Sequence, residues 1–158
     1  MSFVPDDFSV PAGFVTAHLK IRKLCARDVY LDYLAVISSI DLIKRLRGGG
    51  DWPSQDLTIE DDLIDLAWHQ REFERQSSFA YTVMNPDESE CLGCLYIVPP
   101  HFRPNVPEGA EAVVSCWVTQ KAYDAGLYAE LYKAMKAWLE KEWPFNNLHW
   151  LNTEIPQD

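Results

Sequence analysis

The sequence predicts one α/β domain, a mixed central sheet with helices on both faces in the order β-α-α-β-β-β-α-β. Three observations predict it: short strand-like segments, two stretches with apolar residues at helical spacing, and a closing strand, helix and strand. Such a β-α-β crossover makes the last two strands parallel. A length of 158 residues, 47% of them apolar, fits a single domain over residues 1–158.

The opening of the chain predicts one strand and one helix. Residues 14–24 alternate between apolar and polar side chains, which is typical of a half-buried strand. Residues 26–46 have apolar side chains at helical spacing after Asp28, a residue type that often caps a helix. Glycines 48–50 end this helix, and they lack the spacing of a phosphate-binding loop.

A second helix is predicted to begin after Thr58. Thr58 and Asp61 have the spacing of a capping box. The apolar side of this helix is expected from Ile59, Leu63, Leu66 and Phe73. We interpret Trp68 in this helix, and Trp138 in a later one, as core residues.

The second half predicts three neighbouring strands, a long helix and a last strand. Residues 77–84 and 90–98 flank the turn sequence NPDES, which indicates an antiparallel hairpin, and residues 110–118 are expected beside it. Residues 127–142 have the period of a helix that ends before a proline. Residues 146–155 predict the final strand, parallel to the one at 110–118.

Charge and composition exclude some partners. The formal net charge of −10 argues against nucleic acid and against anionic membrane surfaces, which need lysine and arginine. It leaves an anionic small ligand open, because such a ligand depends on local donors. The N-terminus has no secretory pattern, and no apolar run approaches the ~20 residues of a membrane span. The expected location is therefore the cytoplasm.

The four cysteines do not predict a metal site. Cys91 and Cys94 have C-x-x-C spacing, but a structural zinc site usually needs a second such pair, and the sequence has none. The motif continues into a predicted strand, so its two thiols are expected on opposite faces. Buried structural cysteines are favoured over a redox pair.

The order of elements and three stretches of sequence resemble the GNAT superfamily of N-acetyltransferases. "HLKIRKLCARD" is similar to the first strand and helix of that family, and "FAYTVMNPDESECLGCLYIV" resembles its central hairpin. "AVVSCWVTQKAYDAGLYAELYKAMKAWL" resembles its fourth strand, cofactor loop and third helix. The resemblance covers about residues 14 to 155.

The resemblance implies acetyl-CoA, or another acyl-CoA, as co-substrate, bound in a gap between the fourth and fifth strands. In this family the loop Q/R-x-x-G-x-G/A holds the pyrophosphate, the fourth strand pairs with the pantetheine amides, and the acetyl group passes directly to an amine. The resemblance implies these cofactor-binding residues: Cys116, Trp117, Val118, Tyr123, Asp124, Ala125, Gly126, Leu127 and Tyr128.

The loop departs from the family pattern at two of its three defining positions. Gly126 matches, but Tyr123 stands in the Q/R position and Tyr128 in the second small position. A small residue at this position lets the backbone approach the phosphate closely, and the ring of Tyr128 hinders that approach. Asp124 adds a negative charge, which at ~4 Å from a phosphate costs on the order of 1 kcal/mol in water. Asp124 can alternatively be a helix cap that needs no ligand.

For the reaction, Glu111 is the candidate base, because the attacking amine must be neutral. Tyr128 is the candidate acid, because the leaving thiolate benefits from a proton donor. A solvated glutamate and a packed tyrosine are the alternatives. The predicted activity is N-acetyl transfer to a small amine or amino-acid-like acceptor. The alternatives are a non-catalytic GNAT-like ligand-binding or dimerisation module and, third, a thiol-redox protein. An exposed sheet edge predicts a homodimer.

Overall fold

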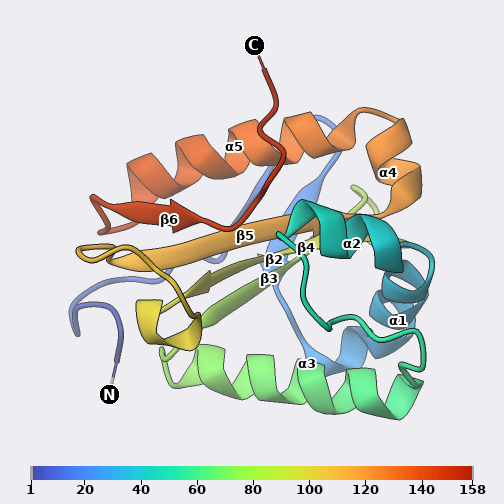
Figure 1. The fold of residues 1–158 in the computed structure, drawn as a ribbon, viewed down its shortest axis with the longest axis horizontal. Helices are drawn as coiled ribbons and strands as arrows, with labels where there is room; N and C mark the ends of the chain where they lie inside the picture. The colour runs from blue at the N-terminus through green and yellow to red at the C-terminus, as the bar shows by residue number, and fades with distance from the viewer. Residues whose placement is uncertain (1, 158) are drawn as a thin grey trace.

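A single sheet organises the molecule. The computed structural model describes residues 2–157, whose strands form one six-stranded sheet in the order β1-β2-β3-β4-β5-β6 (Figure 1). Neighbours are antiparallel except β5 and β6, which are parallel, as the β-α-β crossover predicts. The strands are β1 Gly13–Val15, β2 Lys20–Lys23, β3 Phe79–Met84, β4 Cys91–Val98, β5 Ala112–Val118 and β6 Leu148–Trp150.

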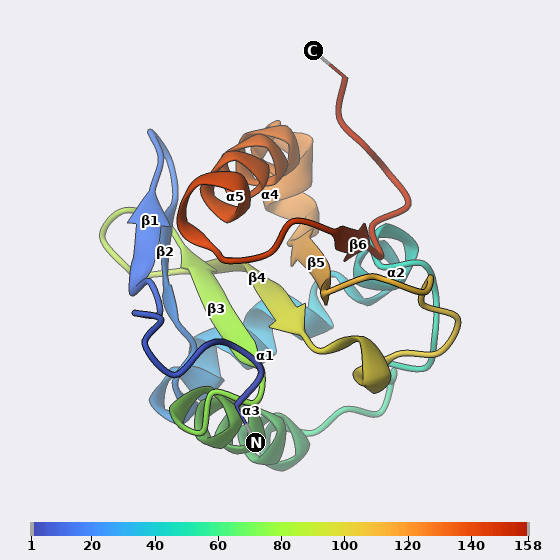
Figure 2. The same ribbon diagram turned by 90° about the vertical axis from the view of Figure 1, so that its left-hand side faces the viewer.

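Helices cover both faces of this sheet, so the predicted fold class is confirmed. Figure 2 shows α5 on one face and α1 and α3 on the other. The helices are α1 Val29–Ile37, α2 Ile40–Leu46, α3 Ile59–Glu74, α4 Gln120–Asp124 and α5 Leu127–Glu142, with short 3₁₀ turns at Ala26–Asp28 and Pro100–Phe102.

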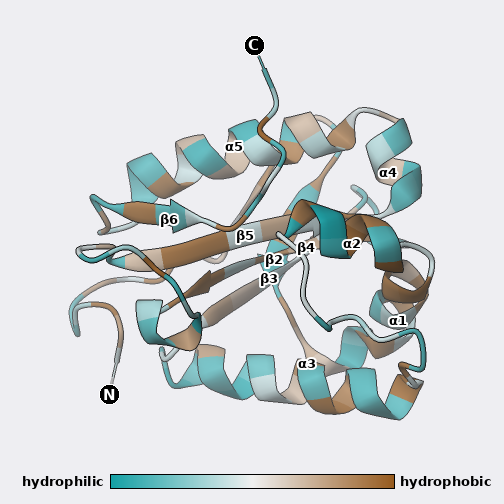
Figure 3. Cartoon of the chain, in the orientation of Figure 1, coloured by the Kyte–Doolittle hydropathy of each residue, from teal (hydrophilic) through white to brown (hydrophobic). Residues whose placement is uncertain are grey.

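The core lies along the central strands. Every residue of β3, β4 and β5 is buried, because helices or loops cover both sides of each strand. Figure 3 shows hydrophobic colouring along β5 and hydrophilic colouring over much of the outer surface of α3 and α5. Edge-to-face aromatic contacts extend the core, with Tyr81 and Trp138 ring centroids 5.1 Å apart.

The segment 14–24 is two strands rather than the single predicted strand. β1 and β2 form a hairpin through a turn in which the Thr16 N–H donates to the Leu19 carbonyl at 2.9 Å. Glu130 of α5 accepts hydrogen bonds from the Thr16 hydroxyl and the His18 N–H, and so holds this turn. Val15 is therefore 72% exposed, although the alternation had placed it with the buried side chains. The alternating pattern does not show a turn that a distant helix stabilises.

The predicted helix at 26–46 is interrupted. α1 ends at Ile37 and α2 begins at Ile40, and the Ser38 hydroxyl donates to the Ala35 carbonyl at 2.8 Å in the break. The Asp28 side chain does not cap α1. It forms an ion pair with Arg22 of β2 at 2.8 Å instead.

α3 begins with the predicted capping box of Thr58 and Asp61. Its apolar face is narrower than predicted, because Leu66 and Phe73 are buried whereas Ile59 and Leu63 are exposed. Trp68 is 62% exposed, so the prediction that it is a core residue is wrong.

The hairpin and the long helix predicted in the second half of the chain agree with the structure. β3 and β4 form the antiparallel hairpin, and α5 has the predicted bounds. β6 is shorter than predicted, and the chain from Leu151 onward leaves the sheet. Within residues 2–157 no helix combines the length and apolar character that crossing a bilayer requires.

Candidate functional site

β5 and β6 diverge where the family resemblance predicts the cofactor. They pair from Ala112 to Val114, and the last hydrogen bond, from the Leu151 N–H to the Val114 carbonyl, is 3.0 Å long. Beyond it the Asn152 side chain pairs with the β5 backbone. Its Oδ1 accepts from the Cys116 N–H at 3.0 Å, and its Nδ2 donates to the Cys116 carbonyl at 2.9 Å. The backbone groups expected to pair with pantetheine therefore already pair with an amide of the chain.

Tyr128 fills the next part of this gap. It is 4% exposed, its hydroxyl donates to the Glu154 carbonyl at 2.6 Å, and it accepts from Asn152 Nδ2 at 2.9 Å. Burial is the main cause that raises the pKa of Tyr128, and the neighbouring Cys116 adds to it. A phenol with a raised pKa gives up its proton less readily, which weakens Tyr128 as a proton donor to a thiolate.

The backbone N–H groups of the loop after β5 are largely used inside the protein. α4 is capped by Thr119, whose hydroxyl accepts from the Ala122 N–H at 3.2 Å. The Gln120 N–H donates to the Ser39 hydroxyl at 2.8 Å. Asp124 lies at the end of α4 and accepts from Gln120 Nε2 at 2.8 Å, so it caps neither helix.

Gly126 is the N-cap of α5, between Ala125 and Leu127. Its φ of +80° lies in the left-handed region that favours glycine. No side chain caps this helix start. A Cβ at Gly126 would meet nothing within 4 Å, so the glycine is required by its backbone conformation and not by a close neighbour.

Charges at this helix start are poorly suited to a diphosphate. The Tyr123 hydroxyl donates to the Glu154 carboxylate, and Asp124 lies beside it in sequence. Arg45 pairs with Glu154 at 3.6 Å and stacks over the Tyr123 ring at 5.3 Å. Lys121 pairs with Glu90 at 2.9 Å. The nearby cations are thus engaged by carboxylates of the protein.

The gap does not fit coenzyme A in this conformation. Its amide-binding part has the right donor and acceptor at Cys116, but Asn152 occupies them. Its phosphate-binding part has Tyr128 where a small residue is expected, and two carboxylates nearby. Trp117 and Val118 are both buried in β5.

The two predicted catalytic residues lie at different ends of β5. Glu111 precedes the strand and accepts from the Asn147 N–H at 2.8 Å, which ties the start of β5 to the chain before β6. Tyr128 contacts Asn152, and Asn152 pairs with Cys116. Cys116 lies five residues after Glu111 along β5. At ~3.3 Å per residue, Glu111 and Cys116 are separated by about 17 Å. The structure does not bring Glu111 and Tyr128 together.

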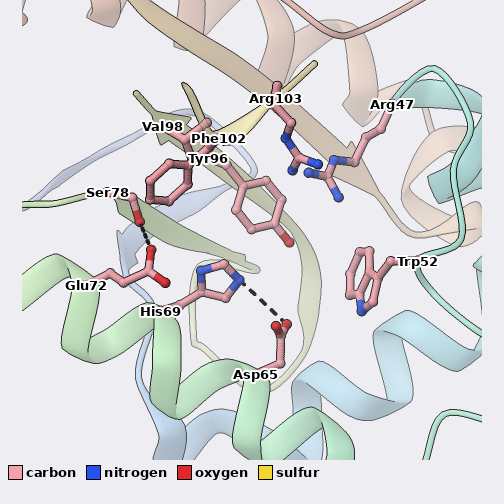
Figure 4. A pocket seen from close by; sticks show the side chains of 10 residues that line it. All are labelled: Arg47, Trp52, Asp65, His69, Glu72, Ser78, Tyr96, Val98, Phe102 and Arg103. Atoms are coloured by element: carbon pink, nitrogen blue, oxygen red, sulfur yellow. Dashed lines mark hydrogen bonds and ion pairs between the residues drawn. The ribbon is translucent and has the colours of Figure 1, made fainter. Parts of the chain in front are cut away.

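A pocket lies on the other face of β4 and β5. It has a volume of about 390 Å³. Figure 4 shows its lining side chains, which come from the chain after α2, from α3, from the residue before β3, from β4 and from the loop after β4. They are Arg47, Trp52, Asp65, His69, Glu72, Ser78, Tyr96, Val98, Phe102 and Arg103. We call this the Arg47–Arg103 pocket.

One wall of the Arg47–Arg103 pocket is cationic and aromatic. The Arg47 guanidinium stacks over the Tyr96 ring at 4.5 Å and over the Trp52 ring at 5.6 Å. Its Nε donates to the Ser115 hydroxyl of β5 at 3.3 Å. Burial first, and the nearby charge of Arg47 second, lower the pKa of Arg103.

The opposite wall is acidic. His69 Nε2 lies 3.6 Å from Asp65 Oδ2, one turn away on α3, and Glu72 accepts a hydrogen bond from the Ser78 hydroxyl. Tyr96, which is buried between the walls, accepts from Trp117 Nε1 at 3.0 Å. The pocket therefore separates positive from negative charge across an aromatic floor.

Sequence reasoning did not find this pocket. Its residues are scattered between positions 47 and 103, and no two of its charged groups form a known motif. The i, i+4 spacing of Asp65 and His69 was the one local signal, because such residues meet on one helix face. Only the packing of α3 against β3 and β4 brings the two walls together.

The cysteines are not arranged for redox chemistry. All four are free, and Cys91, Cys94 and Cys116 are buried. Burial, as the first cause, raises the pKa of Cys91 and of Cys116 to about 12, which keeps both as unreactive thiols. This supports the structural interpretation.

The sheet order, the parallel β5–β6 pair and the helix that links them define an α/β protein with the fold of the GNAT superfamily of N-acetyltransferases. The ribosomal-protein-S5-alanine acetyltransferase from Vibrio fischeri matches 83% of this chain and 68% of its own with a TM-score of 0.60 and 13% identity. A GNAT-family acetyltransferase from Bacillus anthracis matches 86% and 70%, with a TM-score of 0.59 and 16% identity.

The microcin C7 self-immunity acetyltransferase MccE, solved with acetyl-CoA and AMP, matches 83% of this chain and 68% of its own, with a TM-score of 0.59 and 13% identity. No family model matches the sequence, and no curated protein matches it either. Structural neighbours of this chain are thus acetyltransferases, and at these identities the likeness establishes the fold.

Proposed function

We propose that this chain is a GNAT-fold module that binds a small molecule in the Arg47–Arg103 pocket and does not use acyl-CoA as a co-substrate. The pairing of the Asn152 amide with both backbone groups of Cys116 carries this proposal. Tyr128 supports it, because its buried ring and hydroxyl bind Asn152 and the chain at Glu154. A CoA molecule would have to replace these contacts.

Titration calorimetry of the full chain with CoA and with acetyl-CoA tests the proposal. We expect no saturable heat up to about 1 mM ligand, since a contact set of this kind must be broken before the ligand binds. Saturable binding that Gly126→Trp abolishes would overturn the proposal. Melting curves of both chains show whether the tryptophan at a position with positive φ simply unfolds the protein.

A second candidate is acyl-CoA-dependent N-acetyl transfer to a small amine or amino-acid-like acceptor, as the family resemblance implies. The divergence of β5 and β6 after Val114 favours this candidate. The backbone N–H and carbonyl of Cys116 also favour it, because they already pair with an amide group, as they would with pantetheine. For acyl transfer, residues 152–157 would have to move out of the gap and the Tyr128 side chain would have to adopt another rotamer. Glu111 and Tyr128 stay the proposed base and acid.

The second candidate predicts acyl transfer that depends on the gap. Release of free thiol from acetyl-CoA, measured with a thiol reagent over a panel of small amines, would support it. Tyr128→Ala should then raise the affinity for CoA, because it opens the phosphate-binding part, whereas Tyr30→Ala, on the exposed surface of α1, should leave it unchanged. Absence of thiol release in the wild-type chain and in Tyr30→Ala, which both keep the proposed base and acid, favours the ligand-binding module.

Assembly and location are also proposals. The sheet edges that predict a homodimer are three-residue strands, β1 and β6, and sedimentation velocity at several concentrations measures whether the chain associates. A cytoplasmic location is supported by four free cysteines, which a reducing compartment maintains. The partner we propose is a small molecule, and neither nucleic acid nor membrane.

A further inference from the structure

We propose that the Arg47–Arg103 pocket binds a small zwitterion, with its carboxylate between the two arginines and its ammonium group facing Asp65. This inference rests on the proposed function, because it names the class of ligand that the module binds. It is carried by the separation of charge across the pocket, which a molecule with one group of each sign matches.

The two arginines need an anion. Figure 4 shows the guanidinium groups of Arg47 and Arg103 close together on one side of the pocket. Among residues 2–157, no carboxylate lies within 4.0 Å of either guanidinium. Repulsion and burial both disfavour this arrangement, which agrees with the lowered pKa of Arg103. A carboxylate between the groups removes the repulsion and accepts paired N–H donors.

Arg47 is held in place for this contact. It lies between the Tyr96 and Trp52 rings and donates to the Ser115 hydroxyl. Stacking on an aromatic face fixes the plane of a guanidinium while its remaining N–H groups stay available. A side chain that is already ordered loses little conformational freedom when a ligand binds.

Asp65 is the carboxylate available to an ammonium group. Glu72 already accepts from the Ser78 hydroxyl, whereas Asp65 has a single contact in the pocket, the 3.6 Å one to His69. The pocket volume of about 390 Å³ lies near the lower end for ligand pockets, which suits a compact molecule. The aromatic floor can cover its methylene groups.

Three ligands with the same four-carbon length test the inference. 4-Aminobutyrate has one carboxylate and one amine, succinate has two carboxylates, and putrescine has two amines. Calorimetry of the full chain, with the Trp52 indole N–H resonance as a local report, should show the order 4-aminobutyrate, succinate, putrescine from tightest to weakest. Putrescine as the tightest ligand, or heat without a shift at Trp52, would overturn the inference.

Two substitutions assign the ends of the ligand. Arg103→Met should weaken 4-aminobutyrate and succinate about tenfold, which corresponds to the loss of a charged hydrogen bond. Asp65→Asn should weaken 4-aminobutyrate and strengthen succinate, because its second carboxylate is no longer repelled by Asp65. Arg27→Met, an exposed arginine outside the pocket, is the charge-matched control and should change neither. Equal affinities in Arg103→Met and the wild-type chain, both with unchanged melting temperature, would disprove the carboxylate site.

Failure of this inference and failure of the proposed function give different results. A chain that binds CoA but also shows the expected order of the three ligands contradicts only the proposed function. A chain that binds neither CoA nor any of the three contradicts only the zwitterion site.

Discussion

The Asn152 side chain closes the gap between β5 and β6 by hydrogen bonding to groups that line it. A carboxamide has an acceptor and two donors, and Asn152 uses them on the Cys116 N–H, the Cys116 carbonyl and the Tyr128 hydroxyl. All three partners are buried or nearly so. A buried polar group without a partner costs about 1–3 kcal/mol, so the asparagine is needed as long as the gap is closed.

Replacing Asn152 by leucine should therefore destabilise the protein. We expect a loss of about 2–4 kcal/mol in the free energy of unfolding, since Cys116 and Tyr128 lose their partners. Urea unfolding followed by fluorescence measures it. Thr153→Ala is the matched control, because the exposed Thr153 side chain makes one hydrogen bond, to the Arg45 carbonyl, and should lose less than about 1 kcal/mol. Equal losses in the two variants would contradict the assigned role of Asn152.

A second residue-scale feature is the carboxyl pair of Asp32 in α1 and Asp62 in α3. Both side chains are buried, and both Asp62 oxygens lack a hydrogen-bond donor unless Asp32 is protonated. Burial is the first cause that raises the pKa of each, and the interaction with Asp62 raises that of Asp32 further. The pair therefore shares a proton, and its fully ionised form is disfavoured.

This pair makes stability depend on pH. A raised pKa in the folded state means that the folded protein binds more protons than the unfolded one, so stability falls as pH rises from the ordinary carboxyl range through the raised pKa values. Asp62→Asn removes one of the two charges. We expect it to be more stable than the wild type by about 1 kcal/mol at pH 8, with the difference shrinking toward pH 4.

Melting temperatures measured from pH 4 to pH 8 check this prediction. Glu60→Gln, an exposed carboxyl at the start of the same helix, is the control and should show no growing difference. A stabilisation by Asp62→Asn that is constant across the range would show that the pair does not titrate between pH 4 and pH 8.

At the scale of elements, α5 is the helix in which the apolar pattern of the sequence best matches the residues that are buried. It has six buried residues, and its bounds match the period of its apolar side chains. α3 differs, because much of its surface faces solvent: Trp68, Leu63 and Ile64 are exposed. An apolar side chain on a helix does not by itself indicate burial, so pattern alone placed Trp68 in the core.

The contrast between the two helices predicts that replacing tryptophan by alanine has a large effect on stability in α5 and a small one in α3. Trp138→Ala should cost about 3–5 kcal/mol, because it removes a buried indole that packs against Tyr81 and Trp143. Trp68→Ala should change the free energy of unfolding by less than about 1 kcal/mol, since the side chain is 62% exposed. Chemical denaturation of both variants provides the comparison, and a large loss at Trp68 would indicate that another molecule covers α3.

The sequence was informative about elements whose signals are local. The hairpin of β3 and β4, the capping box of Thr58 and the parallel β5–β6 pair follow from nearby residues. The β1–β2 turn could not be predicted, because Glu130, more than a hundred residues away, stabilises it. The same reason hid the Arg47–Arg103 pocket, whose walls come from elements that only the tertiary fold brings together.

The family pattern likewise gave only part of the site. Gly126 has a left-handed backbone conformation, which favours glycine, and the strands diverge at the expected place. The side chains that occupy the gap between β5 and β6 could not be predicted, because they depend on the path of the chain after β6. The sequence showed Tyr128 as a departure, but its partners, Asn152 and Glu154, are known only from the fold.

For the whole molecule, the chain after β6 joins parts that the sheet leaves separate. The Thr153 N–H donates to the Leu46 carbonyl of α2 at 3.0 Å, Asn152 holds β5, and Glu154 holds Tyr123 and Tyr128. The gap and the Arg47–Arg103 pocket lie on opposite faces of β5, with Arg47 contacting Ser115 between them. Closing the gap therefore also fixes the end of α2 from which Arg47 extends.

Ending the chain after Leu151 separates two reasons for the closed gap. It removes Asn152 and Glu154 but keeps Tyr128 and Asp124. We expect a loss of about 2–4 kcal/mol in stability, as for Asn152→Leu, and still no saturable binding of CoA, because the phenol ring and the aspartate stay at the helix start. Calorimetry with CoA on the shortened and the full chain, at a temperature where both are folded, gives the answer. CoA binding by the shortened chain alone would mean that the segment after β6 is a removable cover, and acyl transfer would then replace ligand binding as the better account of this fold.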